Sequence, residues 1–72
     1  MEKKVSITFT SDELCHLIAS LDLHEFNNYE DHNKEHRKFM KGMCTKLIKG
    51  LHRTGYTTPT SDSLERFLKE NY

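Results

Sequence analysis

The chain has 72 residues, with 11 basic and 11 acidic side chains and a formal net charge of zero at pH 7. This length predicts one small domain, residues 1–72, and the neutral charge argues against a nucleic-acid-binding role. No apolar run approaches the length of a transmembrane helix.

The small size of the domain limits how it can be stabilised. A chain this short buries only about 60% of its unfolded surface, so such domains rely on disulfides, a metal or oligomerisation. No apolar stretch follows the charged N-terminus, so we expect a cytoplasmic protein. Cys15 and Cys44 are then expected to be reduced, buried thiols. Oligomerisation is therefore the predicted stabiliser.

A short β-strand is predicted at the N-terminus. Residues Val5 to Phe9 alternate apolar and polar, and no second run of this kind follows. Because a lone strand leaves its backbone groups without partners, a second copy or another protein's sheet must pair with it. We therefore predict a homo-oligomer, dimer or larger, with Val5, Ile7 and Phe9 facing its interface.

Three helices are expected after the strand. Thr10 and Glu13 have the spacing of a capping box, which predicts a helix from Ser11 to about Glu25. Asn27 and Asn28 form a weak break before a second helix, expected from about Tyr29 to Arg53.

The end of the second helix is clearly marked. Gly55 suits a left-handed residue after a helix, and Thr60 or Ser61 can cap a third helix over about Asp62 to Asn71. The predicted fold class is therefore mainly α, with a short N-terminal strand, a helical hairpin and a short C-terminal helix.

The first helix carries a second argument for an oligomer. One apolar stripe contains Leu14 and Ile18, and a second beside it includes Leu23 and Phe26. We predict that one stripe packs on the second helix and that Leu23 and Phe26 contact another subunit. The alternative is that the second and third helices cover both stripes.

Charge is strongly segregated along the chain. Residues 12–33 contain six acids and no Lys or Arg, whereas residues 34–53 contain seven bases and one acid, so the two segments carry −6 and +6. This layout can simply complement the helix dipole and neighbouring helices. The functional alternative is partner binding through charged faces. Its candidate residues are Lys34, Arg37, Lys38, Lys41, Asp22 and Glu25.

No catalytic motif is found in the sequence. His32 to His36 matches the H-x-x-E-H pattern, but the chain lacks the cleft and the distant third ligand of such zinc peptidases. A structural site from His32, His36 and a cysteine lacks a close Cys/His pair to anchor it. We therefore predict a protein that is not an enzyme and has no metal or cofactor.

Residues Lys4 to Leu14 resemble the opening of ribbon-helix-helix repressors. In that family, strands of two subunits pair and their outward residues read the DNA major groove. The resemblance implies that Lys4, Ser6 and Thr8 would read DNA, while Val5, Ile7 and Phe9 would be buried. The second predicted helix is longer than in that family and a third follows, so a DNA-binding regulator is the alternative function.

A short, charged chain without catalytic residues is also similar to small phage-encoded proteins that block host enzymes. This similarity is one of composition and implies an inhibitor of a replication, transcription or defence enzyme. We therefore predict a viral homo-oligomeric module that binds and occludes a larger protein.

Overall fold

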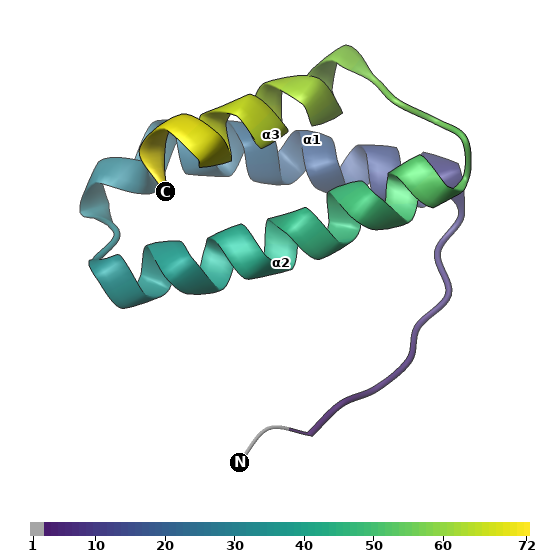
Figure 1. Cartoon of the computed structure of the whole chain (residues 1–72), viewed down its shortest axis with the longest axis horizontal. Coiled ribbons are helices and arrows are strands. Elements are labelled where there is room, and N and C mark those ends of the chain that lie inside the picture. The colour runs from purple at the N-terminus through teal and green to yellow at the C-terminus, as the bar shows by residue number, and fades with distance from the viewer. Residues whose placement is uncertain (1–2) are drawn as a thin grey trace.

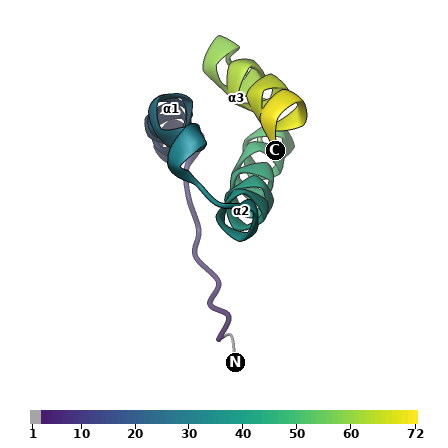
Figure 2. The same cartoon turned by 90° about the vertical axis from the view of Figure 1, so that its left-hand side faces the viewer.

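The computed structural model describes residues 3–72, so Met1 and Glu2 of the predicted domain lie outside the described residues. It consists of three α-helices and one 3-10 helix: α1 (Ser11–Asn28), η1 (Tyr29–Asp31), α2 (Lys34–Arg53) and α3 (Pro59–Asn71) (Figure 1). Seen end-on, the three α-helices stand at the corners of a triangle (Figure 2). The prediction of a mainly helical fold is confirmed. None of the helices in residues 3–72 is both long and apolar enough to cross a membrane.

The start of α1 is the one that its sequence predicts. The Thr10 hydroxyl accepts from the Glu13 amide at 3.1 Å, and the Glu13 carboxylate accepts from the Thr10 amide at 2.9 Å. Two backbone N–H groups at the start of the helix, those of Thr10 and Glu13, therefore have hydrogen-bond partners within these four residues. The helix continues past the predicted end at Glu25 as far as Asn28.

The connection to α2 differs from the prediction. Residues Tyr29–Asp31 form the separate 3-10 turn η1 instead of the first turn of α2. Asn33 then caps α2, because its side-chain oxygen accepts from the His36 amide at 2.8 Å. The expected helix start at Tyr29 was wrong because this later cap competes successfully with helix continuation.

The connection to α3 is partly as predicted. Gly55 has a φ of +84°, the left-handed conformation expected after a helix. α3, however, begins at Pro59 and not at Asp62, with Thr58 as its cap. Proline suits the first helical position because it has no N–H to leave unpaired. The side chains of Thr58 and Ser61 each accept from the other's backbone amide at 3.0 Å.

One apolar core joins the three α-helices. α3 packs against both α1 and α2, which run antiparallel. On α2, Ile48 is buried in this core, whereas the neighbouring Leu47 is only half-buried. The buried apolar residues are Leu14, Ile18, Met40, Cys44, Ile48, Leu51, Leu64 and Leu68.

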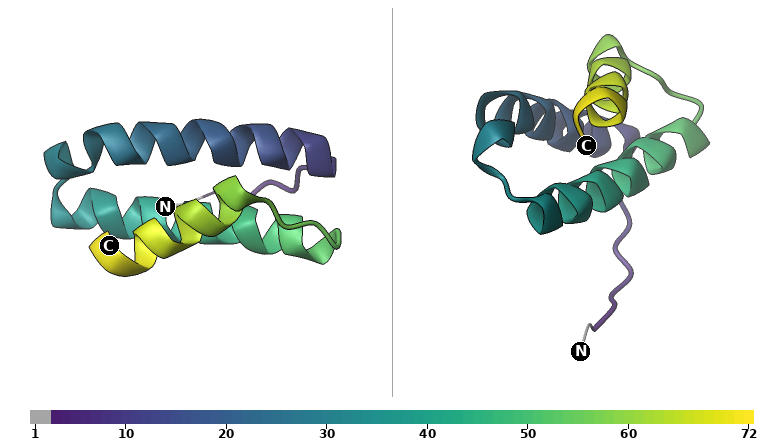
Figure 3. Two further views of the ribbon diagram at one scale, coloured as in Figure 1. Left: turned by 90° about the horizontal axis from the view of Figure 1, so that it is seen from above. Right: turned by 60° about the vertical axis from the view of Figure 1, so that its left-hand side comes forward.

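The N-terminal segment is the main departure from the predicted fold. Residues 3–9, here called the arm, have no regular secondary structure and lead away from the start of α1 (Figure 3), and the first of these residues share a hollow with α2. The predicted strand at Val5 to Phe9 is not formed, and the described residues 3–72 contain no strand. The physical reason is that no other segment of this chain offers a strand edge to satisfy its backbone groups. Val5 and Ile7 are 81% and 68% exposed.

Candidate functional site

A buried carboxylate marks the candidate site. Glu25 lies in the last turns of α1 and is fully buried, within hydrogen-bond distance of His32, just before α2, and of Tyr72, at the end of α3. Burying an ionised carboxylate is costly unless it is paired and hydrogen-bonded. The surroundings of Glu25 must therefore supply donors.

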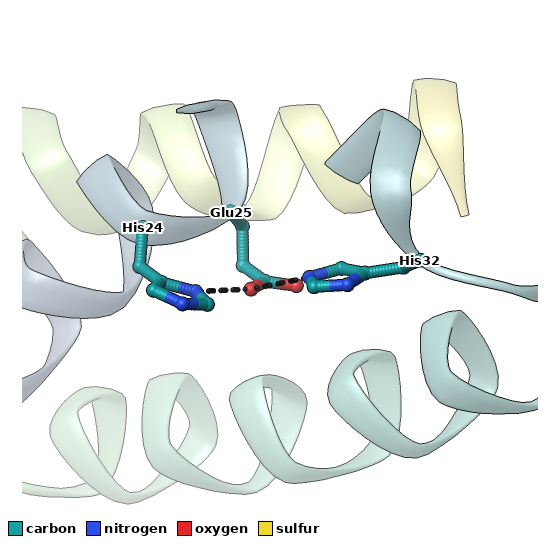
Figure 4. A group of neighbouring side chains, drawn as sticks. All are labelled: His24, Glu25 and His32. Carbon is teal, nitrogen blue, oxygen red and sulfur yellow. Dashed lines mark hydrogen bonds and ion pairs between the residues drawn. The ribbon is translucent and has the colours of Figure 1, made fainter. Parts of the chain in front are cut away.

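Three side chains surround the Glu25 carboxylate. The Tyr72 hydroxyl donates to Oε1 at 2.6 Å. His24 Nδ1 and His32 Nε2 lie 2.8 Å and 3.3 Å from Oε2, on either side of it (Figure 4). Both rings can donate to this oxygen when His24 carries its proton on Nδ1 and His32 on Nε2. Among the described residues, no buried side-chain nitrogen or oxygen lacks a hydrogen-bond partner.

The pKa values of the cluster reflect this arrangement. Burial by itself raises the pKa of Glu25, but hydrogen bonds from Tyr72, His24 and His32 outweigh it and hold the pKa below its ordinary value. Burial and the hydrogen bond to Glu25 raise the pKa of Tyr72. The cluster therefore pairs an ionised Glu25 with a neutral phenol.

Local sequence explains how His32 reaches Glu25. The chain leaves α1 through η1, which turns it back toward the bundle, and His32 directly follows this turn. Arg37 on α2 secures the turn, since its Nη2 and Nε donate to the Tyr29 carbonyl at 2.9 Å and 3.2 Å. The guanidinium also lies 5.8 Å from the ring centre of Tyr29 and 6.0 Å from that of Tyr72.

The predicted basic residues of α2 line one groove beside this cluster. Together with His32, Asn71 and Tyr72, they border a hollow of about 580 Å³. Lys41 Nζ donates to the Tyr72 carbonyl at 3.3 Å, and Arg37 is half-buried by its contacts with Tyr29. We call this hollow the basic groove. Its basic side chains are Lys34, Arg37, Lys38 and Lys41.

The two acidic residues predicted to contact a partner, Asp22 and Glu25, are not openly exposed, although Asp12, Glu13, Glu30 and Asp31 are. Glu25 is buried in the polar cluster, so its assignment as a surface contact was wrong. Asp22 is half-buried; burial raises its pKa, and a hydrogen bond from Ser63 partly offsets this rise. Neither residue offers an open acidic face to a partner.

The apolar residues predicted for the oligomer interface lie on the surface of the single chain. Leu23 and Phe26 are 65% and 67% exposed. Phe9 is 37% exposed and, like Val5 and Ile7, belongs to the arm. Phe39 on α2 is also exposed, and sequence reasoning did not single it out. Leu23 and Phe26 of the second stripe are thus left largely uncovered by α2 and α3.

Sequence reasoning missed the core position of Glu25. A signal was present, since Glu25 follows Leu14 and Ile18 by 11 and 7 residues and so continues their stripe. An acidic residue on the buried face of a helix indicates a carboxylate whose charge is paired or hydrogen-bonded inside the core. Of the candidate metal set of the sequence, the fold brings together His32 and His36, whose ring centres lie 4.1 Å apart, but among the described residues no cysteine completes it. His24, Glu25 and His32 instead place their ligand atoms within 4.8 Å of one another.

The comparisons with known proteins identify no relatives. No family model matches the chain, and searches of curated proteins and of solved structures find no significant similarity. Function must therefore be argued from the surfaces and the polar cluster.

Proposed function

We propose that this chain is a non-enzymatic protein-binding module that forms a homodimer or higher homo-oligomer and inhibits a larger enzyme by occluding it. The observation that carries the proposal is the exposure of large apolar side chains on the arm and on α1, chiefly Val5, Ile7, Leu23 and Phe26. Exposed apolar groups of this kind favour a protein contact, because burying them removes apolar surface from water.

The arm supports self-association in particular. Its backbone is extended and forms no hydrogen-bonded ladder within the chain. Pairing with the arm of a second copy would satisfy those groups and place Val5, Ile7 and Phe9 in one interface. The strand predicted from the sequence would then form only in the oligomer.

The basic groove supports a contact with an acidic surface of the larger partner. Complementary charge would raise the association rate and the specificity of this contact more than its affinity. An enzyme of replication, transcription or defence, encountered in the cytoplasm by a phage-encoded inhibitor, fits the composition of the chain.

A charge-reversal experiment tests partner binding. In one variant, Lys34, Lys38 and Lys41 become Glu; in the matched control, Lys46, Lys49 and Arg53 of the same helix become Glu. The native chain is used to capture its partner from a lysate of the source cells, and the captured enzyme is assayed with each variant. We expect the groove variant to lose binding and inhibition and the control to retain both. Equal binding by the two variants would contradict a contact through the groove.

DNA binding is a second candidate function. The arm exposes Lys4, Ser6 and Thr8, the residues that the ribbon-helix-helix resemblance assigns to base reading. Lys3 and Lys4 also share a hollow with Lys38 and Lys46 of α2. A DNA-binding protein would retard duplex DNA in a gel, with an affinity that falls steeply as salt rises. Unaltered migration at low salt would exclude this function.

A further inference from the structure

The polar cluster has the donor set of a metal site. We propose that His24, Glu25 and His32 bind one zinc ion through His24 Nδ1, Glu25 Oε2 and His32 Nε2. This inference is independent of the proposed function, because it does not require that the chain bind any protein.

The three ligand atoms lie within 4.8 Å of one another, so one tetrahedral ion can bind all three once the two ring nitrogens move to about 3.3 Å from each other. Zinc bonds of about 2.0–2.2 Å place neighbouring ligand atoms about 3.3 Å apart. His32 Nε2 lies 3.3 Å from Glu25 Oε2, and His24 Nδ1 lies 2.8 Å from it. His24 must therefore withdraw by about half an ångström from the carboxylate. The His24 side chain is 57% exposed, so little packing opposes this movement.

The chemistry of the donors favours zinc over calcium or magnesium. Imidazole nitrogen suits zinc, whereas calcium and magnesium prefer sets made of oxygen alone. Glu25 is already buried, with its carboxylate facing both rings (Figure 4). Its other oxygen, Oε1, accepts from the Tyr72 hydroxyl, and such outer hydrogen bonds orient a ligating carboxylate. Three protein ligands and a solvent-facing His24 leave the fourth position for water.

The location of the site defines what the ion would do. His24 and Glu25 belong to α1, whereas His32 lies after η1, in the link to α2. The ion would therefore tie the end of α1 to this link and hold the turn against the bundle. Because an ion that binds only the folded chain stabilises it by mass action, unfolding should depend on zinc concentration.

The test uses the full chain, stripped of metal with a chelator and dialysed. Zinc chloride is added in a calorimetric titration and in thermal unfolding followed by circular dichroism. We expect saturable binding of one ion per chain and a melting temperature that rises with zinc concentration. The absence of saturable binding would overturn the proposal.

Two variants separate a metal ligand from a hydrogen-bond donor. His24→Asn and His32→Gln keep an amide near the ring nitrogen that faces Glu25, but amides are poor zinc ligands. Each should weaken zinc binding by more than the roughly 10- to 100-fold that changes to outer-shell partners cost. His16→Asn and His52→Gln alter exposed histidines outside the cluster and should leave zinc affinity unchanged. Full zinc affinity in both cluster variants would place the ion elsewhere and overturn the proposal.

Two measurements on the native chain identify the ligands without the use of any variant. In NMR spectra of the five histidine rings, zinc should shift the signals of His24 and His32 most. Cobalt in place of zinc should give a spectrum of nitrogen and oxygen ligands without a thiolate charge-transfer band. Ring shifts confined to other histidines, or a thiolate band from Cys15 or Cys44, would contradict the assigned ligands.

Discussion

The Tyr72 hydroxyl donates to Glu25 Oε1 at 2.6 Å and so joins two residues that are 47 positions apart. This bond links the end of α3 to α1 at the buried polar cluster. Phe67 packs beside Tyr72, with 5.6 Å between the ring centres, and thereby helps to fix the ring that carries the donor. The bond is thus a tertiary contact within a small core.

Removing this donor should destabilise the fold. In Tyr72→Phe, Glu25 Oε1 remains buried and loses its short hydrogen bond, which should lower the free energy of unfolding by about 1–3 kcal/mol. Urea unfolding followed by circular dichroism measures the change. Tyr56→Phe is the matched control, because Tyr56 is 55% exposed and the same substitution there should have little effect. Equal stability of both variants and the native chain would show that the bond contributes nothing.

Acid should weaken the contribution of Glu25 to stability. Its folded pKa is held below the ordinary value, so the folded state favours the ionised form more than the unfolded state does. The resulting stability is fully present above the unfolded pKa and is lost as the pH falls through the folded pKa. We therefore expect the native chain to exceed Glu25→Gln in stability near pH 7 and the difference to shrink as the pH falls toward 3. Urea titrations of both proteins across this range test the sign; a difference that grows on acidification would contradict it.

The two cysteines should differ sharply in reactivity. Cys44 is fully buried, and burial together with the Glu25 charge raises its pKa to about 11, whereas Cys15 is half-buried. Because the thiolate is the reactive form, a thiol reagent at pH 8 should modify Cys15 first and Cys44 only when the chain unfolds. Cys15→Ser and Cys44→Ser isolate each thiol for rate measurements. Faster labelling of Cys44 in the native state would show that the core around it is not closed.

The three glycines should respond to alanine in opposite directions. Gly42 and Gly50 lie inside α2; an added Cβ would meet nothing within 4 Å at Gly42 and only Leu14 Cδ1, at 3.8 Å, at Gly50. Alanine at either position should stabilise the chain by about 0.5–1 kcal/mol. Gly55→Ala should destabilise it, because φ there is +84°. Thermal unfolding of the three variants measures these signs, and a destabilising Gly50→Ala would indicate that α1 and α2 pack more closely than described.

The features predicted correctly from sequence are those decided by a few adjacent residues. The capping box depends only on the spacing of Thr10 and Glu13, and the left-handed Gly55 depends only on its position after a helix. Both could therefore be predicted from the sequence. The wide apolar arc of α1 led to the prediction that Leu23 and Phe26 contact another subunit; both are exposed in the single chain, and the contact itself stays a prediction.

The features that were missed depend on distant partners. Whether Glu25 lies in solvent or in the core is decided by Tyr72, far along the chain, and by His32 beyond the η1 turn. The alternation of Val5 to Phe9 likewise predicts a strand, but a strand also needs a neighbouring strand. Within one chain none is present among the described residues, so the arm forms no ladder of backbone hydrogen bonds. The basic residues of α2 are visible in the sequence, but their arrangement with Asn71 and Tyr72 around one groove depends on the packing of α3.

Self-association through the arm and α1 is the central claim, and the molar mass in solution tests it most directly. Size-exclusion chromatography with light scattering should give a dimer or larger for the native chain. Ile7→Asp should give a monomer with unchanged helical content, because Ile7 is 68% exposed in the single chain and an unpaired charge in an interface is strongly disfavoured. Lys69→Asp, a charge change on the exposed face of α3, is the control and should keep the native mass. A native chain that elutes as a compact monomer at every concentration would contradict the claim.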